Sequence, residues 1–127
     1  MLDKKQIVDE INKSFTENNT EGFLAHCSED VKWTMAGEKT STGKQAVRDF
    51  MASCGEGMEP PAFDVKQKIA EGDSVVCYGD MTMKGPDGQP GTYAYCDIYR
   101  FDGDKVAELI SYVVQTNKED KNLEAAA

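Results

Sequence analysis

Apolar residues recur at helical spacing at the start of the chain. Asp3 followed by Gln6 predicts a capping box. The apolar positions after it return every three or four residues, as on one face of a helix: Ile7, Val8, Ile11 and Phe15. Asn18 and Asn19 favour a left-handed helix end. The pattern predicts a first helix that packs one face against a core.

Shorter elements follow this helix. Thr20 is expected to cap a short helix that carries Phe23 and Leu24. A turn is expected at residues 28–30. After it, apolar and polar residues alternate from 31 to 35, which predicts a short strand with one buried face.

A polar loop is expected at residues 37–43, and a third helix after it. Its apolar stripe comprises Ala46, Val47, Phe50 and Met51, and it is expected to end near Cys54 and Gly55. A loop with two prolines is expected at residues 55–61.

The hydrophobic period changes to two after this loop. Alternation and turn residues predict four strands joined by hairpins, at residues 63–69, 75–84, 92–101 and 106–115. Helices first and hairpin-linked strands afterwards indicate an α+β fold. Long strands twist and curl. We therefore expect a curved antiparallel β-sheet with three N-terminal helices on its concave face, a cone-shaped α+β barrel with a pocket at its wide end.

Length and charge narrow the function classes. The 127 residues suit one domain, expected at residues 1–117, with a polar tail at 118–127 that includes a possible cloning remnant. The net charge of −9 argues against nucleic-acid and anionic-membrane partners. The chain contains neither a long apolar run nor a signal-peptide pattern, so we expect a cytoplasmic protein.

Cysteine and histidine usage offers little metal or redox chemistry. Cys27, Cys54, Cys77 and Cys96 form no Cys-x-x-Cys motif, and free buried thiols are the expected state. With one histidine, His26, no metal site is predicted. Cofactors are likewise not expected, because no Gly-x-Gly phosphate loop precedes a helix.

Three motifs carry a family resemblance from about Ile7 to Gln115. They are the residues from Ser28 to Trp33, from Gly43 to Phe50, and from Asp97 to Gly103 with Lys105-Val106 after them. In order and spacing the chain resembles the superfamily of nuclear transport factor 2, ketosteroid isomerase and SnoaL-like polyketide cyclases. The resemblance implies the cone-shaped fold, a sheet-to-sheet homodimer and, in many members, a pocket for an organic ligand. Because this fold hosts many activities, it does not by itself identify one.

The isomerases of this superfamily use a carboxylate base, a tyrosine and an aspartic acid. By position, the aspartic acid matches Asp97. The base position falls near Met35, which cannot take a proton, and the tyrosine position falls near Ile11 or Asn12. The resemblance therefore carries over one catalytic group of three and argues against steroid-type isomerisation.

Asp97 is the strongest candidate for a catalytic residue. The alternation of its strand places it among aromatic residues on one face: Tyr93, Tyr95, Tyr99 and Phe101. Desolvation on such a face raises a carboxyl pKa, and the related isomerases keep such an acid neutral as a hydrogen-bond donor. The alternatives are that Asp97 faces solvent or bonds only a tyrosine hydroxyl.

Other residues are candidates for ligand binding. They are expected to line the concave face around Asp97: Trp33, Met35, Tyr95, Tyr99, Phe15, Phe50, Met81 and Ser111. The estimated strand register puts Ser111 beside Asp97 and Gly79 opposite it, and a glycine in mid-strand marks a bend or the close approach of a ligand. The aromatic and methionine residues are equally explained as core filler.

Three functions remain open. The first is an isomerase-, cyclase- or lyase-type enzyme on a carbonyl-bearing apolar substrate, with Asp97 as acid or hydrogen-bond donor. The second is a non-catalytic protein that binds a small apolar organic ligand, and the third is a dimeric interaction module. The strand at 109–114 is apolar on both faces, so a homodimer that covers the sheet is expected.

Overall fold

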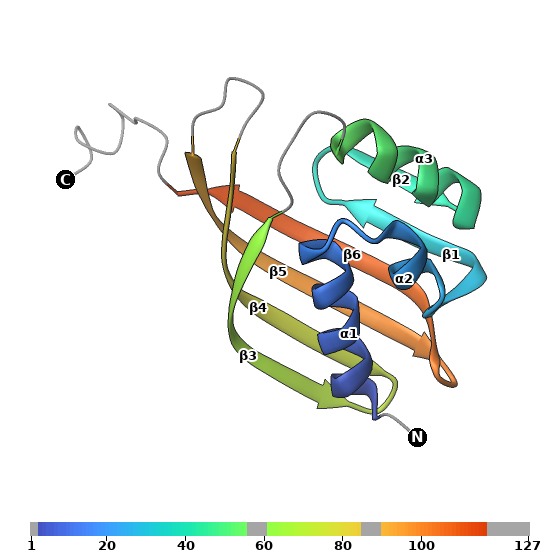
Figure 1. Cartoon of the computed structure of the whole chain (residues 1–127). Coiled ribbons are helices and arrows are strands. Elements are labelled where there is room, and N and C mark those ends of the chain that lie inside the picture. The colour runs from blue at the N-terminus through green and yellow to red at the C-terminus, as the bar shows by residue number, and fades with distance from the viewer. Residues whose placement is uncertain (1–2, 56–60, 85–89, 117–127) are drawn as a thin grey trace.

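The computed structural model describes residues 3–55, 61–84 and 90–116 (Figure 1). In chain order the elements are α1 (Lys4–Thr16), α2 (Thr20–Leu24), β1 (Cys27–Met35), β2 (Lys39–Thr42), α3 (Lys44–Gly55), β3 (Ala62–Glu71), β4 (Ser74–Lys84), β5 (Pro90–Asp102) and β6 (Lys105–Gln115). This is the expected α+β class. The predicted tail at 118–127, most of the loop predicted at 55–61, and residues 85–89 between the strands predicted at 75–84 and 92–101 lie outside the described residues.

The capping pattern starts α1 as predicted. The Asp3 side chain accepts a hydrogen bond from the Gln6 backbone N–H, and the Gln6 side chain accepts one from the Asp3 backbone N–H. After the helix ends, Asn18 takes the left-handed conformation, with φ of 56°. This turn directs the chain into α2, whose cap is Asn19 and not the expected Thr20: the Asn19 side chain accepts from the Gly22 backbone N–H.

Two segments expected to be irregular belong to the sheet. The turn predicted at 28–30 is wrong, because these residues lie inside β1. The loop predicted at 37–43 contains β2, which pairs antiparallel with β1 so that Trp33 faces Ser41. Alternation fails as a signal for β2 because this edge strand buries one residue, and that residue is a serine.

The strands form one six-stranded sheet in the order β2-β1-β6-β5-β4-β3. Four of the five neighbouring pairs are antiparallel, and β1 pairs with β6 in parallel. The expectation of an antiparallel sheet is therefore wrong for this one pair. It forms because the N-terminal strand closes the sheet against the C-terminal strand, which no local pattern predicts.

The helices lie on one face of the curved sheet (Figure 1). Between helices and sheet lies the core, which includes Val8 and Ile11 of α1, Phe23 of α2, and Tyr99 and Leu109 of the sheet, all 0% exposed. This arrangement confirms the expected cone, with the helices on the concave side. No helix in the described residues has the length and hydrophobicity needed to cross a membrane.

The β4–β5 register differs from the expected one by two residues. Gly79 lies opposite Tyr95, and Asp97 lies opposite Cys77. Because the shift is even, every side chain keeps its expected face. A Cβ at Gly79 would overlap the Asp64 carbonyl oxygen of β3, at the register shift between Val65 and Gln67. This glycine therefore serves a close approach of two strands, not of a ligand.

Candidate functional site

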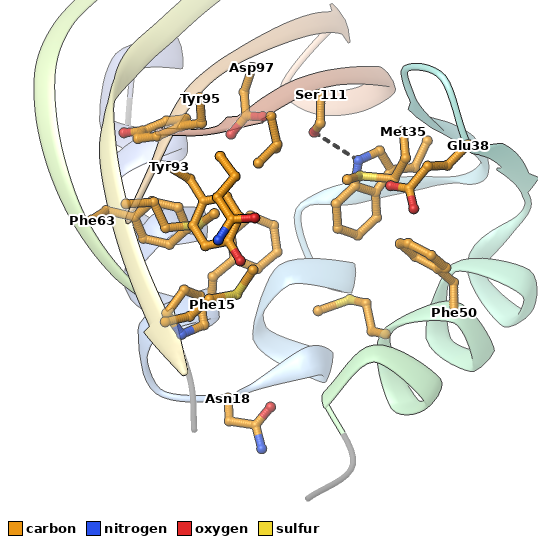
Figure 2. A pocket seen from close by; sticks show the side chains of 17 residues that line it. Phe15, Asn18, Met35, Glu38, Phe50, Phe63, Tyr93, Tyr95, Asp97 and Ser111 are labelled. Atoms are coloured by element: carbon orange, nitrogen blue, oxygen red, sulfur yellow. Dashed lines mark hydrogen bonds between the residues drawn. The ribbon is translucent and has the colours of Figure 1, made fainter. Parts of the chain in front are cut away.

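A cavity of about 530 Å³ lies on the concave face, between the sheet and the helices. Its volume falls within the range expected for a drug-sized ligand. Figure 2 shows the side chains that line it. They come from α1 and the turn after it, α3, the β1–β2 hairpin, the residue before β3, and strands β3 to β6: Phe15, Asn18, Trp33, Met35, Glu38, Phe50, Met51, Pro61, Phe63, Met81, Met83, Tyr93, Tyr95, Asp97, Ser111, Val113 and Gln115.

Aromatic rings form the walls of the cavity. Phe15 stacks on Trp33 with 5.8 Å between ring centroids, and Trp33 meets Phe50 edge-on at 5.5 Å. On the other side Phe63 meets Tyr95 edge-on at 5.2 Å. Such contacts fix the rings relative to one another. The walls are therefore flat and apolar, which suits an organic ligand with a ring or a compact apolar body.

Asp97 supplies a buried carboxyl group to this cavity. It is 6% exposed, and its carboxyl group points into the pocket from β5 (Figure 2). Burial raises the pKa of Asp97 to about 6, because desolvation penalises the charged form, and the Ser111 hydroxyl partly opposes this shift. A carboxyl group with this pKa exchanges protons near neutral pH, as proton-transfer catalysis requires.

Ser111 links Asp97 to the aromatic wall. It lies opposite Asp97 in the β5–β6 pair, as the sequence predicted. Its Oγ accepts a hydrogen bond of 2.9 Å from Trp33 Nε1, which Figure 2 marks. With one lone-pair direction used by Trp33, the Ser111 proton is free to point at the neighbouring carboxylate. Asp97, Ser111 and the Trp33 indole N–H thus form a small polar cluster on the sheet side of a mostly apolar cavity.

A second polar cluster comprises Asn12, Cys77 and the Tyr95 hydroxyl. Cys77 Sγ accepts a hydrogen bond from Asn12 Nδ2 at 3.6 Å and lies 3.7 Å from the Tyr95 hydroxyl. Burial raises the pKa of the Cys77 thiol and of the Tyr95 hydroxyl. The Tyr95 ring therefore lines the pocket, while its hydroxyl contacts Cys77.

Tyr99 does not line the cavity, although the sequence placed it there. It is 0% exposed, and its strand neighbours Val75 and Leu109 are fully buried too. It shares a face with Asp97, but core side chains fill the space at its end of the sheet. Eight of the nine residues predicted for the site do line the cavity: Trp33, Met35, Tyr95, Asp97, Phe15, Phe50, Met81 and Ser111.

Sequence reasoning missed the polar residues of the cavity lining at Asn18, Glu38 and Gln115. Glu38 belongs to the tight turn of the β1–β2 hairpin, where its backbone N–H donates to the Met35 carbonyl oxygen at 2.9 Å. Interpreting residues 37–43 as a loop concealed this hairpin. The position of Asn18 could have been inferred from the sequence, because the predicted left-handed helix end turns the chain at this residue.

The described part of the chain contains no group of side chains that could bind a metal ion. Within residues 3–55, 61–84 and 90–116, no three His, Cys, Asp or Glu side chains are grouped so that they could hold an ion. Cys27, Cys77 and Cys96 are free thiols. The chemistry that these residues can offer is hydrogen bonding, proton exchange and apolar contact.

The family model for the SnoaL-like domain matches residues 8–109. No functionally curated protein matches the chain. The solved structures with the same fold include an NTF2-like protein of unknown function from Burkholderia pseudomallei. It is 20% identical, with a TM-score of 0.81, covering 87% of this chain and 90% of that one.

Two further solved structures illustrate the range of this fold. An LEH-like epoxide hydrolase of M. tuberculosis is 12% identical, with a TM-score of 0.74, covering 86% of this chain and 80% of that one. A hypothetical protein from Catenulispora acidiphila with a ketosteroid isomerase-like fold, in complex with trimethylamine, is 16% identical. Its TM-score is 0.78, with 87% and 86% of the two chains covered. At these identities the likeness shows the fold alone.

Proposed function

The chain belongs to the family of SnoaL-like domains, and from that premise we propose that it binds a small apolar organic molecule in the aromatic cavity. The proposed reaction is of the isomerase, cyclase or lyase type, on a carbonyl group that contacts Asp97. One observation carries this proposal: a buried carboxyl group with a pKa of about 6 points into an apolar cavity of ligand size. Such perturbed acids in clefts are markers of functional sites.

In the proposed mechanism, protonated Asp97 donates a hydrogen bond to the substrate carbonyl oxygen. Negative charge grows on that oxygen as a neighbouring C–H bond breaks, so the bond from Asp97 strengthens in the transition state. A preorganised donor in a water-poor cavity is worth about 10²–10³ in rate. The proton of that C–H bond needs an acceptor. Among the described lining residues the other carboxylate is Glu38, which in this mechanism takes the proton as the general base.

A second candidate function is binding without catalysis. Met35 lines the cavity. The resemblance puts the base of the related isomerases near this residue, and a thioether takes no proton. The Asn12 side chain donates to Cys77 and does not line the cavity. The resemblance puts the catalytic tyrosine of the related isomerases near Ile11 or Asn12, so neither the base nor the tyrosine is matched. This favours binding without catalysis.

We further propose a homodimer through the sheet face that the helices leave uncovered. Tyr78, Tyr112 and Val114 lie on this face and are 38%, 47% and 61% exposed. A stable interface would bury on the order of 1,200 Å² or more. The proposal includes a cytoplasmic location, which the free thiols support, and no nucleic-acid or membrane partner.

The first step of the test is a ligand screen. Trp33 is the only tryptophan and lines the cavity, so its fluorescence reports on a bound molecule. Steroids, polyketide-like ketones and small terpenoids are screened by this signal and by thermal shift. A ligand at 100 times its Kd adds about 2.7 kcal/mol of stability. A screen without any hit would leave the dimeric interaction module as the surviving function.

Asp97 variants then separate enzyme from binder. Asp97→Asn keeps a weaker donor, so part of the activity should remain, whereas Asp97→Ala should lose about 10²–10³. If Asp97 is a general base, the two variants will be equally inactive, because neither accepts the proton. If the protein only binds, both variants change affinity alone.

A further inference from the structure

Among the described residues, the ionisable side chains that line the cavity include carboxyl groups but no basic group. Asp97 and Glu38 both line it, and none of its described lining residues is a lysine, arginine or histidine. A ligand with a carboxylate or phosphate would meet two like charges without any positive partner. The repulsion from buried Asp97 is weakly screened, whereas Glu38 is exposed and solvent screens its charge. The lining therefore disfavours anionic ligands.

Asp97 is a buried carboxyl group without an ion-pair partner among the described residues. The groups that surround it are Ser111 and Trp33 on β6 and β1, Cys77 on β4, and Tyr95 and Tyr99 on its own strand. Burial raises the pKa of Cys77, Tyr95 and Tyr99 as well, so none of these neighbours titrates between pH 5 and 7.5.

This environment leaves a charge for a ligand to neutralise. With a pKa of about 6, roughly nine tenths of Asp97 is ionised at pH 7. An ionised carboxylate buried without a partner is costly, and a ligand cation beside it would remove that cost. At neutral pH a positively charged ligand should therefore bind beside Asp97 more tightly than a neutral ligand of the same shape.

The aromatic walls suit a cation too. Five aromatic side chains line the cavity: Phe15, Trp33, Phe50, Phe63 and Tyr95. Figure 2 shows Phe15, Phe50, Phe63 and Tyr95 around it. Ring faces attract desolvated cations, by about 2 kcal/mol or more. One of these rings already contacts a cation of the chain: Lys39 Nζ, which does not line the cavity, lies 5.6 Å from the Phe50 ring centroid.

We propose that the preferred ligand at neutral pH is an apolar molecule with a protonated or quaternary amine, whose nitrogen lies against Asp97 and the aromatic rings. This inference rests on the proposed function, because it assumes that the cavity is the ligand site and that Asp97 is its polar contact. The protonated form of Asp97 still serves a carbonyl oxygen. Carbonyl ligands are thus expected to bind better below pH 6, and ammonium ligands above it.

Three probes of one shape test the charge preference through Trp33 fluorescence and calorimetry. They are phenethyltrimethylammonium, the neutral alcohol 2-methyl-4-phenyl-2-butanol, and 3-phenylpropionate. At pH 7.5 the ammonium should bind at least about tenfold more tightly than the alcohol, and the carboxylate most weakly. Because the quaternary nitrogen does not titrate, its Kd should weaken about tenfold from pH 7 to pH 5, in proportion to the ionised fraction of Asp97. The alcohol's Kd should not weaken.

Variants assign the effect to Asp97. In Asp97→Asn the ammonium should lose about tenfold in affinity at pH 7.5, along with its pH dependence, while the alcohol binds as before. Glu38→Gln should weaken the ammonium by a smaller factor. The control is Glu71→Gln, an exposed carboxylate at the end of β3 and outside the cavity lining, which should leave all three affinities unchanged.

Two results would overturn the inference in different ways. If the alcohol binds at least as tightly as the ammonium, or if Asp97→Asn leaves the ammonium affinity unchanged, the charge preference is wrong and the ligand pocket remains. If none of the three probes changes the Trp33 signal and the ketone screen is also empty, the proposed function fails and this inference fails with it.

Discussion

The indole N–H of Trp33 on β1 donates a hydrogen bond of 2.9 Å to the hydroxyl oxygen of Ser111 on β6. The two strands are 78 residues apart in sequence and form the parallel pair of the sheet. This contact occupies one acceptor direction of Ser111, and Asp97 lies directly opposite Ser111 on β5. The hydrogen bond from Trp33 therefore influences how the Ser111 hydroxyl can stabilise the ionised form of Asp97.

Ser111→Ala should raise the pKa of Asp97 further above 6, because it removes the hydroxyl that favours the charged carboxylate. NMR titration of the Asp97 carboxyl carbon measures this shift directly. The loss of a partner for the partly buried indole N–H should also cost about 1 kcal/mol of stability.

Trp33→Phe is the matched variant for this prediction. It removes the donor to Ser111 but leaves the serine hydroxyl, so the pKa of Asp97 should change less than in Ser111→Ala. An equal titration of Asp97 in the parent and in Ser111→Ala would show that the serine has only a structural role.

Asp97 should make folding stability depend on pH. Its pKa in the folded chain is raised from 3.8 to about 6, so the folded state holds the proton more tightly than the unfolded state does. Stability should therefore be greatest below pH 4 as far as this group is concerned. It should fall as pH rises from about 4 to about 6, by about 3 kcal/mol.

Asp97→Asn removes this titration. Urea unfolding from pH 4 to pH 8 should show a variant that is more stable than the parent at pH 7 and roughly equal to it at pH 4, with Glu71→Gln as the control for an exposed carboxylate. An Asn variant less stable than the parent at pH 7 would contradict the assignment of Asp97 as an uncompensated buried acid.

Gly79→Ala should destabilise the sheet by more than about 1 kcal/mol, because the new methyl group overlaps backbone atoms of Asp64 and Lys66 on β3. Gly91→Ala is the matched control in the next strand. The nearest atoms to its methyl group would be those of the Tyr93 side chain, which can move. Thermal unfolding of both variants measures the difference, and equal losses would refute the close approach of β3 and β4 as the cause.

Tyr112→Arg should dissociate the proposed homodimer. Tyr112 is 47% exposed on the uncovered sheet face, and a charge there cannot be buried without a partner. Sedimentation at micromolar concentration should find a dimer for the parent and a monomer for the variant, with Trp33 fluorescence unchanged. A monomeric parent would refute this interface.

Local patterns were sufficient for most elements and for the orientation of their residues. The helical period of α1, its capping box and the left-handed Asn18 are confirmed. Alternation in β5 places Asp97 on the helix-covered face, and the two-residue error in the β4–β5 register did not change this. Side-chain orientation in a strand depends only on parity, which the sequence carries by itself.

The amino-acid sequence by itself thus determined an α+β chain with a buried acid on an aromatic strand. Tertiary structure alone decided the parallel β1–β6 pair, the strand β2, the position of Glu38 and the burial of Tyr99 beyond the cavity. The physical reason is that pairing partners and the end of a cavity depend on residues far apart in the chain. Trp33 and Ser111 acquire their shared role only when β1 closes the sheet against β6.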